Sequence, residues 1–161
     1  MFQLPFPVRD ANVGGGAGEF GDLPEWDLSD LYTAEDAPEL IRDLAWLEEE
    51  CANFAKDYEG KLAELDAAGF LACVLRNEKI NGIAGRIMSY AGLRYYQLTI
   101  DAGRAKFLSD MQEKITNFTT PLVFFTLELN RLDDGVLDGL FAESAELARY
   151  KPVFDRIRAM K

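Results

Sequence analysis

The chain has 161 residues, 48% of them hydrophobic and 28% charged, a composition typical of one soluble globular domain. Its net charge of −11 argues against nucleic-acid binding, because phosphate contacts need clustered lysine and arginine. The same charge disfavours an anionic membrane surface, and no apolar run approaches the length of a membrane span.

Residues 1–24 are expected to form a flexible arm ahead of the folded body. They contain Pro5, Pro7 and Pro24 and a glycine cluster within residues 14–18, a composition typical of connecting segments. A glycine-rich loop can bind phosphate, but it then needs a preceding strand and a following lysine and hydroxyl, which are missing here. We therefore expect no phosphate site in the arm.

The cysteines and the first residues together indicate a cytoplasmic protein. Cys51 and Cys73 lie far apart in apolar helical contexts, so we expect buried, reduced thiols rather than a disulfide or a metal pair. The start of the chain lacks the basic stretch and following apolar run of a signal peptide. A cytoplasmic location fits both observations.

From Trp26 onward, apolar residues recur at steps of three and four, which predicts helices and no strands. The segment at residues 26–32 is expected to be pinned to the body through Trp26 and Tyr32. Residues 33–36 have the spacing of a capping box, and a first long helix is expected to follow them and to end near Gly60.

A second long helix is expected over residues 67–98, and small residues form a seam along one of its faces. The members of this seam are Gly82, Gly85, Ser89 and Gly92. Each glycine inside a helix costs about 1 kcal/mol relative to alanine, so the seam needs a physical reason. Close packing against another helix is the expected reason, and a peptide backbone lying along the seam is the alternative.

A third long helix is expected over residues 102–132, with Asp101 as its cap. Pro121 should kink or split this helix, because proline removes a hydrogen bond and clashes with the preceding turn. Asp133 and Ser144 are expected to cap the first two of three short helical segments. These segments are predicted at residues 135–141, 145–150 and 153–160.

Together these patterns predict an all-α domain. We expect three long antiparallel helices, the second and third of which form a hairpin. The short C-terminal helices follow them, and residues 25–161 form one folded body.

Histidine is absent from the chain, and this limits the chemistry that the chain can perform. Serine–histidine and cysteine–histidine nucleophiles and imidazole zinc sites are excluded, so we expect no catalytic residue, no metal site and no cofactor site. Glu128 lies beside an apolar run and is expected to form a structural ion pair rather than to act as a catalytic acid. Its candidate partners are Arg86, Arg94 and Arg131.

A group of tyrosines and one arginine near the end of the second helix is the candidate contact site. Its members are Tyr90, Arg94, Tyr95 and Tyr96. Tyrosine and arginine are favoured at binding surfaces, so the group is a candidate for contact with a peptide or a neighbouring lobe. The alternative is that Tyr90 packs in the core and the other two tyrosines are partly exposed aromatics.

Four stretches of the sequence carry a family likeness. They are LPEWDLSDLY, SYAGL, LVFFTLELNRLDD and ARYKPVFDRIR, at residues 23–32, 89–93, 122–134 and 148–158. In this order they resemble the N-terminal region of the oligoendopeptidase F family, zinc metallopeptidases that cut short peptides. The family holds its zinc on an HExxH helix, and no such motif occurs in this chain.

The resemblance implies that residues 25–161 are the non-catalytic N-terminal helical lobe of such a peptidase and cover its substrate channel. The implied partners are the catalytic domain of the parent enzyme, which holds the zinc, and short peptides that enter the full enzyme. Without that domain, an exposed apolar face is expected to cause self-association. The alternative is a freestanding helical interaction module that has no peptidase role.

Overall fold

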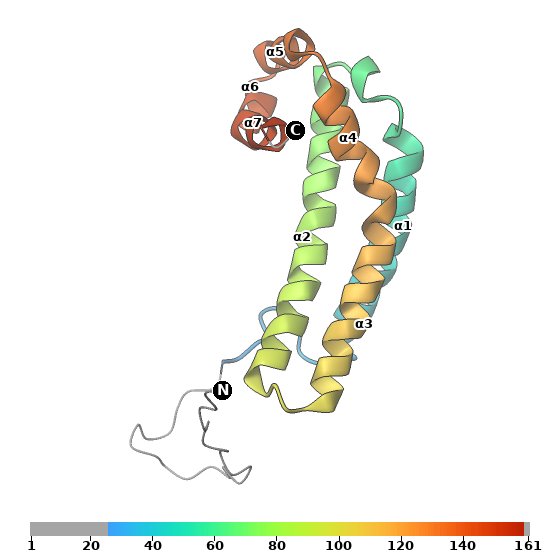
Figure 1. Cartoon of the computed structure of the whole chain (residues 1–161), viewed down its shortest axis with the longest axis vertical. Helices are drawn as coiled ribbons and strands as arrows, with labels where there is room; N and C mark the ends of the chain where they lie inside the picture. The colour runs from blue at the N-terminus through green and yellow to red at the C-terminus, as the bar shows by residue number, and fades with distance from the viewer. Residues whose placement is uncertain (1–25, 160–161) are drawn as a thin grey trace, which may run out of the picture.

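The computed structural model describes residues 26–159, and every regular element in them is helical, which confirms the all-α class. The predicted arm at residues 1–24 lies outside the described residues. Figure 1 shows two helices running side by side in opposite directions and joined by a short loop, α2 (Ala67–Gln97) and α3 (Ala102–Thr119). A third, α1 (Pro38–Tyr58), packs against both of them.

Two aspartates define the starts of the hairpin helices. The Asp66 carboxylate accepts a hydrogen bond from the Gly69 N–H at 2.7 Å, and Asp101 accepts one from the Arg104 N–H at 2.9 Å. Each bond satisfies a backbone donor that the first turn of a helix leaves without a partner. The bond from Arg104 also lowers the pKa of Asp101.

Helix α1 begins without a side-chain cap. Its N-cap residue is Ala37, which has no acceptor group, and Pro38 occupies the first turn, where a missing N–H costs little. The capping box predicted at residues 33–36 is therefore wrong, because these residues form bends and turns before the helix begins. The helix ends at Tyr58, and Gly60 then adopts a φ of 79°, which favours glycine.

Proline divides the third predicted helix. After α3, a 3-10 turn covers Thr120–Leu122, and α4 continues over Val123–Arg131. Pro121 lies in this turn and has no N–H with which to make the helical hydrogen bond. The predicted set of three long helices is therefore not confirmed, because the third is two consecutive segments.

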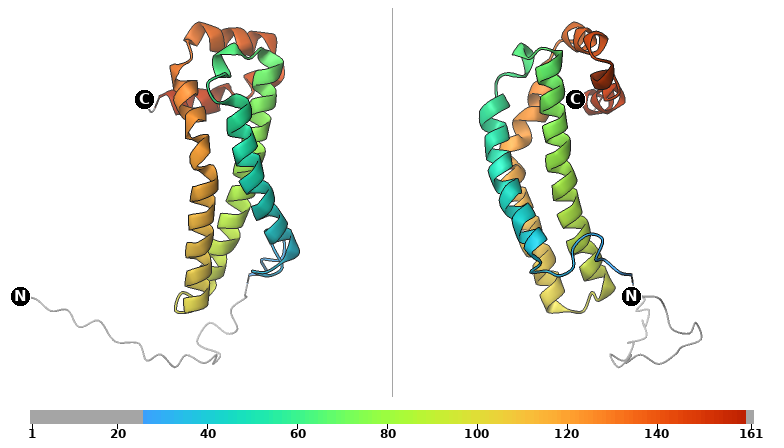
Figure 2. Two further views of the ribbon diagram at one scale, coloured as in Figure 1. Left: turned by 90° about the vertical axis from the view of Figure 1, so that its right-hand side faces the viewer. Right: turned by 180° about the vertical axis from the view of Figure 1, so that it is seen from behind.

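Short helices lie across the end of the bundle at which α2 begins, as Figure 2 shows. Asp133 and Ser144 cap the first two, as predicted, by accepting bonds from the N–H groups of Gly135 at 2.8 Å and Leu147 at 3.2 Å. The three helices are α5 (Asp134–Glu143), α6 (Ala145–Ala148) and α7 (Lys151–Arg158).

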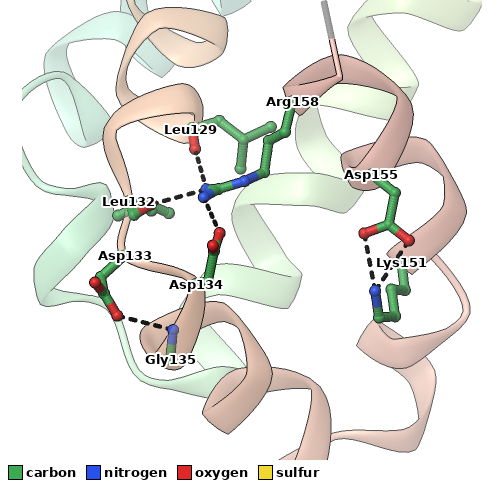
Figure 3. Close-up of polar contacts among 8 residues, drawn as sticks. All are labelled: Leu129, Leu132, Asp133, Asp134, Gly135, Lys151, Asp155 and Arg158. Carbon is green, nitrogen blue, oxygen red and sulfur yellow. Dashed lines mark hydrogen bonds and ion pairs between the residues drawn. The ribbon is translucent and has the colours of Figure 1, made fainter. Parts of the chain in front are cut away.

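Arg158 fastens α7 to the end of α4 (Figure 3). Its Nη1 donates to the carbonyl oxygens of Leu129 at 2.9 Å and Leu132 at 2.8 Å, and its Nη2 pairs with Asp134. The last carbonyls of a helix lack intrahelical donors, and a positive charge there meets the negative end of the helix dipole. This contact therefore holds the short helices against the bundle.

The core is apolar and runs between the long helices. Phe54 of α1 is fully buried, and its ring centroid lies 4.9 Å from Tyr58 and 5.9 Å from both Phe124 and Phe125 of α4. The other large, fully buried side chains include Leu40, Leu47, Phe70, Ile80, Ile87, Leu129 and Leu147. The core thus joins α1, α2, α4 and α6 into one body.

The seam of small residues on α2 faces open space. A Cβ atom added at Gly82 or Gly85 would meet no atom of the described residues within 4 Å, and one at Gly92 would meet only the Tyr96 ring, at 3.8 Å. Ser89 on the same face is exposed. Among residues 26–159, the predicted close helix crossing along the seam is therefore wrong, because Gly82 and Gly85 face open space and Ser89 and Gly92 line an open groove beside α3.

Replacing Gly82 and Gly85 together by alanine is expected to raise the free energy of unfolding by about 1–2 kcal/mol, because alanine favours a helix more than glycine does. Both positions have room for the added methyl group. The control is Gly60→Ala, which places a side chain at positive φ and should lower the free energy of unfolding by about 1 kcal/mol. Urea denaturation measures both, and a less stable double variant would contradict the open placement of this face.

The two cysteines are buried and free, as predicted. Burial raises the pKa of the Cys51 thiol to about 11 and that of Cys73 to about 12, from an ordinary value of 9.0. As the pH rises past this ordinary value, the unfolded chain loses its thiol protons before the folded chain does. The stabilisation from the buried thiols is therefore fully present below pH 9.0 and is lost as the pH rises toward 11 and 12.

We accordingly expect the urea midpoint to fall as the pH is raised above about 9. Burial also raises the pKa of Tyr32 and Tyr90, so these phenols contribute to the same trend. A Cys73→Ala variant should lose less stability per pH unit than the parent chain. An equal slope for the two proteins would show that the thiol does not contribute.

Candidate functional site

A cleft of about 450 Å³ lies where the last turns of α2 meet residues 26–35. It is referred to below as the Arg94 cleft. Two of the four candidate contact residues, Tyr90 and Arg94, therefore share one site. Its aromatic and charged lining consists of Trp26, Tyr32 and Tyr90 together with Asp27, Glu35 and Arg94.

Tyr32 holds the segment at residues 26–35 against the helices. Its side chain is buried, and its ring meets the Tyr90 ring edge to face at 5.5 Å. Its hydroxyl donates to Asp43 of α1 at 2.8 Å, and the Arg86 guanidinium lies 4.4 Å from the ring centroid. Burial, followed by the bond to Asp43, raises the pKa of Tyr32. One side chain thus connects the segment to both α1 and α2.

Trp26 does not pin the segment through its indole ring, contrary to the prediction. The residue is 74% exposed, although it lines the Arg94 cleft. Its carbonyl oxygen accepts a hydrogen bond from Nε2 of Gln97 at 3.0 Å. The backbone of Trp26 is therefore held at the end of α2, while the ring stays available for contact.

Arg94 places hydrogen-bond donors in the cleft. Its Nη1 donates to Oε1 of Gln97 at 3.2 Å, and its Nη2 donates to Oε1 of Glu35 at 3.4 Å. Its Nε is buried and has no hydrogen-bond partner among the described residues, which is costly for a donor. Because the Arg94 and Glu35 side chains are 31% and 34% exposed, solvent screens their ion pair and weakens it.

Tyr90 forms a buried part of the cleft wall. It is 2% exposed, and its ring also meets Phe107 of α3 edge to face at 6.1 Å. Burial raises the pKa of Tyr90, so its hydroxyl stays protonated at neutral pH. Tyr90 therefore packs in the core, and it touches the cleft from that position.

Tyr95 and Tyr96 are not part of the Arg94 cleft. Their ring centroids lie 5.5 Å apart, and Tyr96 is 71% exposed. Tyr96 lines a different groove, which lies between α2 and α3. The structure therefore divides the predicted group between two surfaces of the α2 end.

Glu35 and Gln97 belong to the site but were not predicted from the sequence. Gln97 follows Arg94 by three positions, and this spacing places two side chains on the same face of a helix. The sequence could therefore have predicted that Gln97 lies beside Arg94. Glu35 lies 59 positions from Arg94, and local pattern gives no indication of their contact. That contact depends on the packing of Tyr32, which returns the segment to α2.

Glu128 has a role different from the predicted one. Its carboxylate oxygens accept hydrogen bonds from the N–H groups of Gly60 at 2.6 Å and Leu62 at 3.3 Å. The predicted ion pair is wrong, because these partners are backbone groups, and Arg86 and Arg94 pair with other carboxylates. Glu128 instead fastens α4 to the turn that follows α1.

The Arg94 cleft presents several kinds of chemical group side by side. It combines guanidinium donors, the carboxylates of Asp27 and Glu35, and aromatic faces. Aromatic and arginine side chains are common at protein interfaces, and a few polar groups in an apolar cleft can fix the orientation of a ligand. Within residues 26–159, no three histidine, cysteine, aspartate or glutamate side chains gather in a group that could hold a metal ion.

Within the same residues, no helix has the length and apolar character needed to cross a membrane.

Comparisons with protein-family models, with curated proteins and with solved structures find no match for this chain. The functional interpretation therefore depends on the sequence motifs and on the geometry described above.

Proposed function

We propose that this chain is the non-catalytic N-terminal helical lobe of a zinc oligopeptidase similar to the oligoendopeptidase F family. In this role residues 25–161 cover one side of the substrate channel and limit which peptides enter it. The catalytic domain of the parent enzyme holds the zinc and cuts short peptides. The chain acts in the cytoplasm, as its cysteine usage suggests.

The observation that carries the proposal is that the stretches with the family likeness meet in pairs. The first pair is residues 26–32 and 89–93, which are joined by the rings of Tyr32 and Tyr90, 5.5 Å apart. This contact also builds the Arg94 cleft. Two of the four stretches that carry the likeness therefore lie at the candidate site.

The second pair joins the remaining two stretches at the other end of the bundle. Arg158, from residues 148–158, donates to the carbonyl oxygens of Leu129 and Leu132, from residues 122–134. All four stretches thus serve contacts between distant parts of the chain. This arrangement supports the view that they define one helical lobe.

The residues of this chain do not fit the zinc site of that family. Two histidines of an HExxH helix hold the metal there, and the chain has no histidine. The lobe contributes binding surface instead, with Arg94 and the exposed Trp26 ring as its contact groups. The reaction belongs to the parent enzyme.

Zinc binding and peptidase activity of the 161-residue chain test the non-catalytic role. We expect equilibrium dialysis against Zn²⁺ to show no stoichiometric tight binding. We also expect a fluorogenic short peptide to remain uncut in the presence of zinc. Zinc-dependent hydrolysis by the purified chain, abolished by a chelator and restored by added metal, would contradict the proposal.

The isolated lobe is expected to self-associate, because apolar side chains stay exposed where the hairpin turns. Ile100 is 85% exposed and Trp26 is 74% exposed. Exposed apolar patches on soluble proteins are often interaction sites. Light scattering as a function of concentration tests this, and a clean monomer at high concentration would count against it.

One observation favours the second candidate function, a freestanding helical interaction module. Tyr96 is 71% exposed beside the groove between α2 and α3, and such an aromatic residue is a common anchor for a protein partner. The two candidate functions make different predictions about the protein to which this chain belongs. A peptidase lobe requires a catalytic domain, whereas a freestanding module requires none.

A further inference from the structure

The lining of the Arg94 cleft carries more negative than positive charge. Its charged groups are the carboxylates of Asp27 and Glu35 and the guanidinium of Arg94. Glu35 pairs with Arg94, whereas the Asp27 carboxylate accepts a hydrogen bond from the Ser29 N–H at 2.9 Å and pairs with no cation among residues 26–159. The bond from Ser29 lowers the pKa of Asp27, so this group is charged at neutral pH. The cleft therefore holds one negative charge that a ligand can neutralise.

Trp26 adds an aromatic face to the same cleft. The residue is 74% exposed and lines the cleft. Two other rings of the chain already carry a cation, since Nζ of Lys79 lies 4.7 Å from the Trp46 ring centroid and the Arg86 guanidinium lies 4.4 Å from that of Tyr32. Among the described residues, no lysine or arginine lies over the Trp26 ring. Because the face of an indole ring attracts cations, Trp26 can hold one that comes from outside the chain.

A buried hydroxyl in the cleft wall has no partner. Tyr90 is 2% exposed and lines the cleft. The hydroxyls of Tyr32 and Tyr150 donate to the carboxylates of Asp43 and Glu78, but that of Tyr90 makes no hydrogen bond with any residue in the described part of the chain. A buried polar group without a partner is costly. A ligand N–H that reaches the Tyr90 oxygen removes this cost.

We propose that the Arg94 cleft binds the ammonium group of a peptide, carried by a lysine side chain or by the peptide N-terminus. The group lies between the Asp27 carboxylate and the Trp26 ring, and the Tyr90 oxygen is a further acceptor. An ammonium has three N–H donors and no acceptor, which suits this set of groups. An anionic ligand is disfavoured, because two carboxylates line the cleft and the Arg94 guanidinium already donates to Glu35 and Gln97.

Size and overall charge agree with a peptide ligand of this kind. The volume of about 450 Å³ lies in the range of small-ligand sites, so the cleft has room for one side chain and the backbone beside it. The net charge of −11 attracts cationic peptides over a distance. The inference rests on the proposed function, because it specifies the chemistry of the peptides that the lobe selects.

Peptide titration of the 161-residue chain tests the inference. Trp46→Phe leaves Trp26 as the one tryptophan, so its fluorescence reports on the cleft. The probes are a blocked alanine–lysine–alanine peptide, the same peptide with its lysine acetylated, and a trialanine amide with a free N-terminus. Calorimetry of the unsubstituted chain gives the same three affinities. The protein concentration is held below the range in which light scattering detects self-association.

At least one of the two peptides with an ammonium group should bind about tenfold more tightly than the acetylated peptide, and the tighter of the two identifies the source of the group. This preference should shrink as the salt concentration is raised. Equal affinities for the three peptides, or no binding of any of them, would overturn the inference. Neither result decides whether the chain is a peptidase lobe, because that role depends on a catalytic domain in the parent protein.

Three substitutions locate the binding site. Asp27→Asn should weaken binding of the preferred peptide about threefold, because it removes the negative charge and keeps an oxygen that accepts the Ser29 bond. The matched control, Glu113→Gln at an exposed position of α3, should leave the affinity unchanged. Tyr90→Phe should weaken binding without lowering the urea midpoint, because its hydroxyl has no partner in the described fold. Equal losses for Asp27→Asn and Glu113→Gln would show that overall charge, and not the cleft, attracts the peptide.

Discussion

Replacing Phe54 by alanine is expected to lower the free energy of unfolding by about 3–5 kcal/mol, the range for removing a buried aromatic side chain. Phe54 is fully buried in the middle of the core. Its ring contacts Tyr58 on its own helix and Phe124 and Phe125 on α4. The substitution therefore removes apolar contacts that join α1 to α4 and leaves a cavity between them.

Urea denaturation followed by circular dichroism measures this loss. The matched control is Ile41→Ala on the same helix, where the side chain is 58% exposed. Because surface truncations of this kind change stability by about 0.5 kcal/mol or less, the control should remain close to the parent chain. Similar losses for the two variants would contradict the placement of Phe54 at the centre of the core.

Replacing Glu128 by alanine is expected to have the second largest effect, a loss of about 1–3 kcal/mol. The carboxylate accepts hydrogen bonds from the N–H groups of Gly60 and Leu62 at 2.6 and 3.3 Å. Alanine leaves both donors without this partner in the tight turn that precedes α2. The loss arises from these donors, since Glu128 forms no ion pair with another residue of the described part of the chain.

A Glu128→Gln variant tests whether the negative charge or the hydrogen bonds of Glu128 matter more. Its amide has no charge but keeps one acceptor oxygen in the same place. We expect this variant to recover part of the stability lost in Glu128→Ala. Glu113→Ala, at an exposed position of α3, is the control for the loss of one negative charge. If Glu113→Ala destabilises as much as Glu128→Ala, the turn does not depend on the carboxylate.

The starts of α2, α3, α5 and α6 were predictable because a cap acts over a short distance along the chain. The side chains of Asp66, Asp101, Asp133 and Ser144 each accept a bond from a backbone N–H two or three residues later. The interruption at Pro121 follows in the same way from the missing N–H of one residue. Local chemistry alone determines these features.

Contacts between distant segments were not predictable in this way. Glu128 bonds to a backbone group 68 positions away, and its sequence neighbours give no indication of that partner. The spacing of Gly82, Gly85 and Gly92 identified a common face of α2, but spacing does not reveal whether another helix covers that face. The predicted ion pair of Glu128 and the predicted helix crossing at the glycines both failed because they depend on which distant segments pack together.

In the candidate site, too, some residues could be predicted from the sequence and others could not. Residue type and spacing were enough to select Tyr90 and Arg94, which the structure brings together in one cleft. The same reasoning grouped Tyr96 with them, although the side chain lines the groove between α2 and α3 instead. Glu35 could not be selected, because its place beside Arg94 depends on the buried Tyr32.

The coding sequence that follows the codon for Lys161 tests the central claim most directly. The claim is that this chain is the non-catalytic lobe of a zinc oligopeptidase. It predicts an open reading frame that continues into a long, largely helical segment containing an HExxH motif. A stop codon directly after Lys161 would contradict it and would favour the freestanding interaction module.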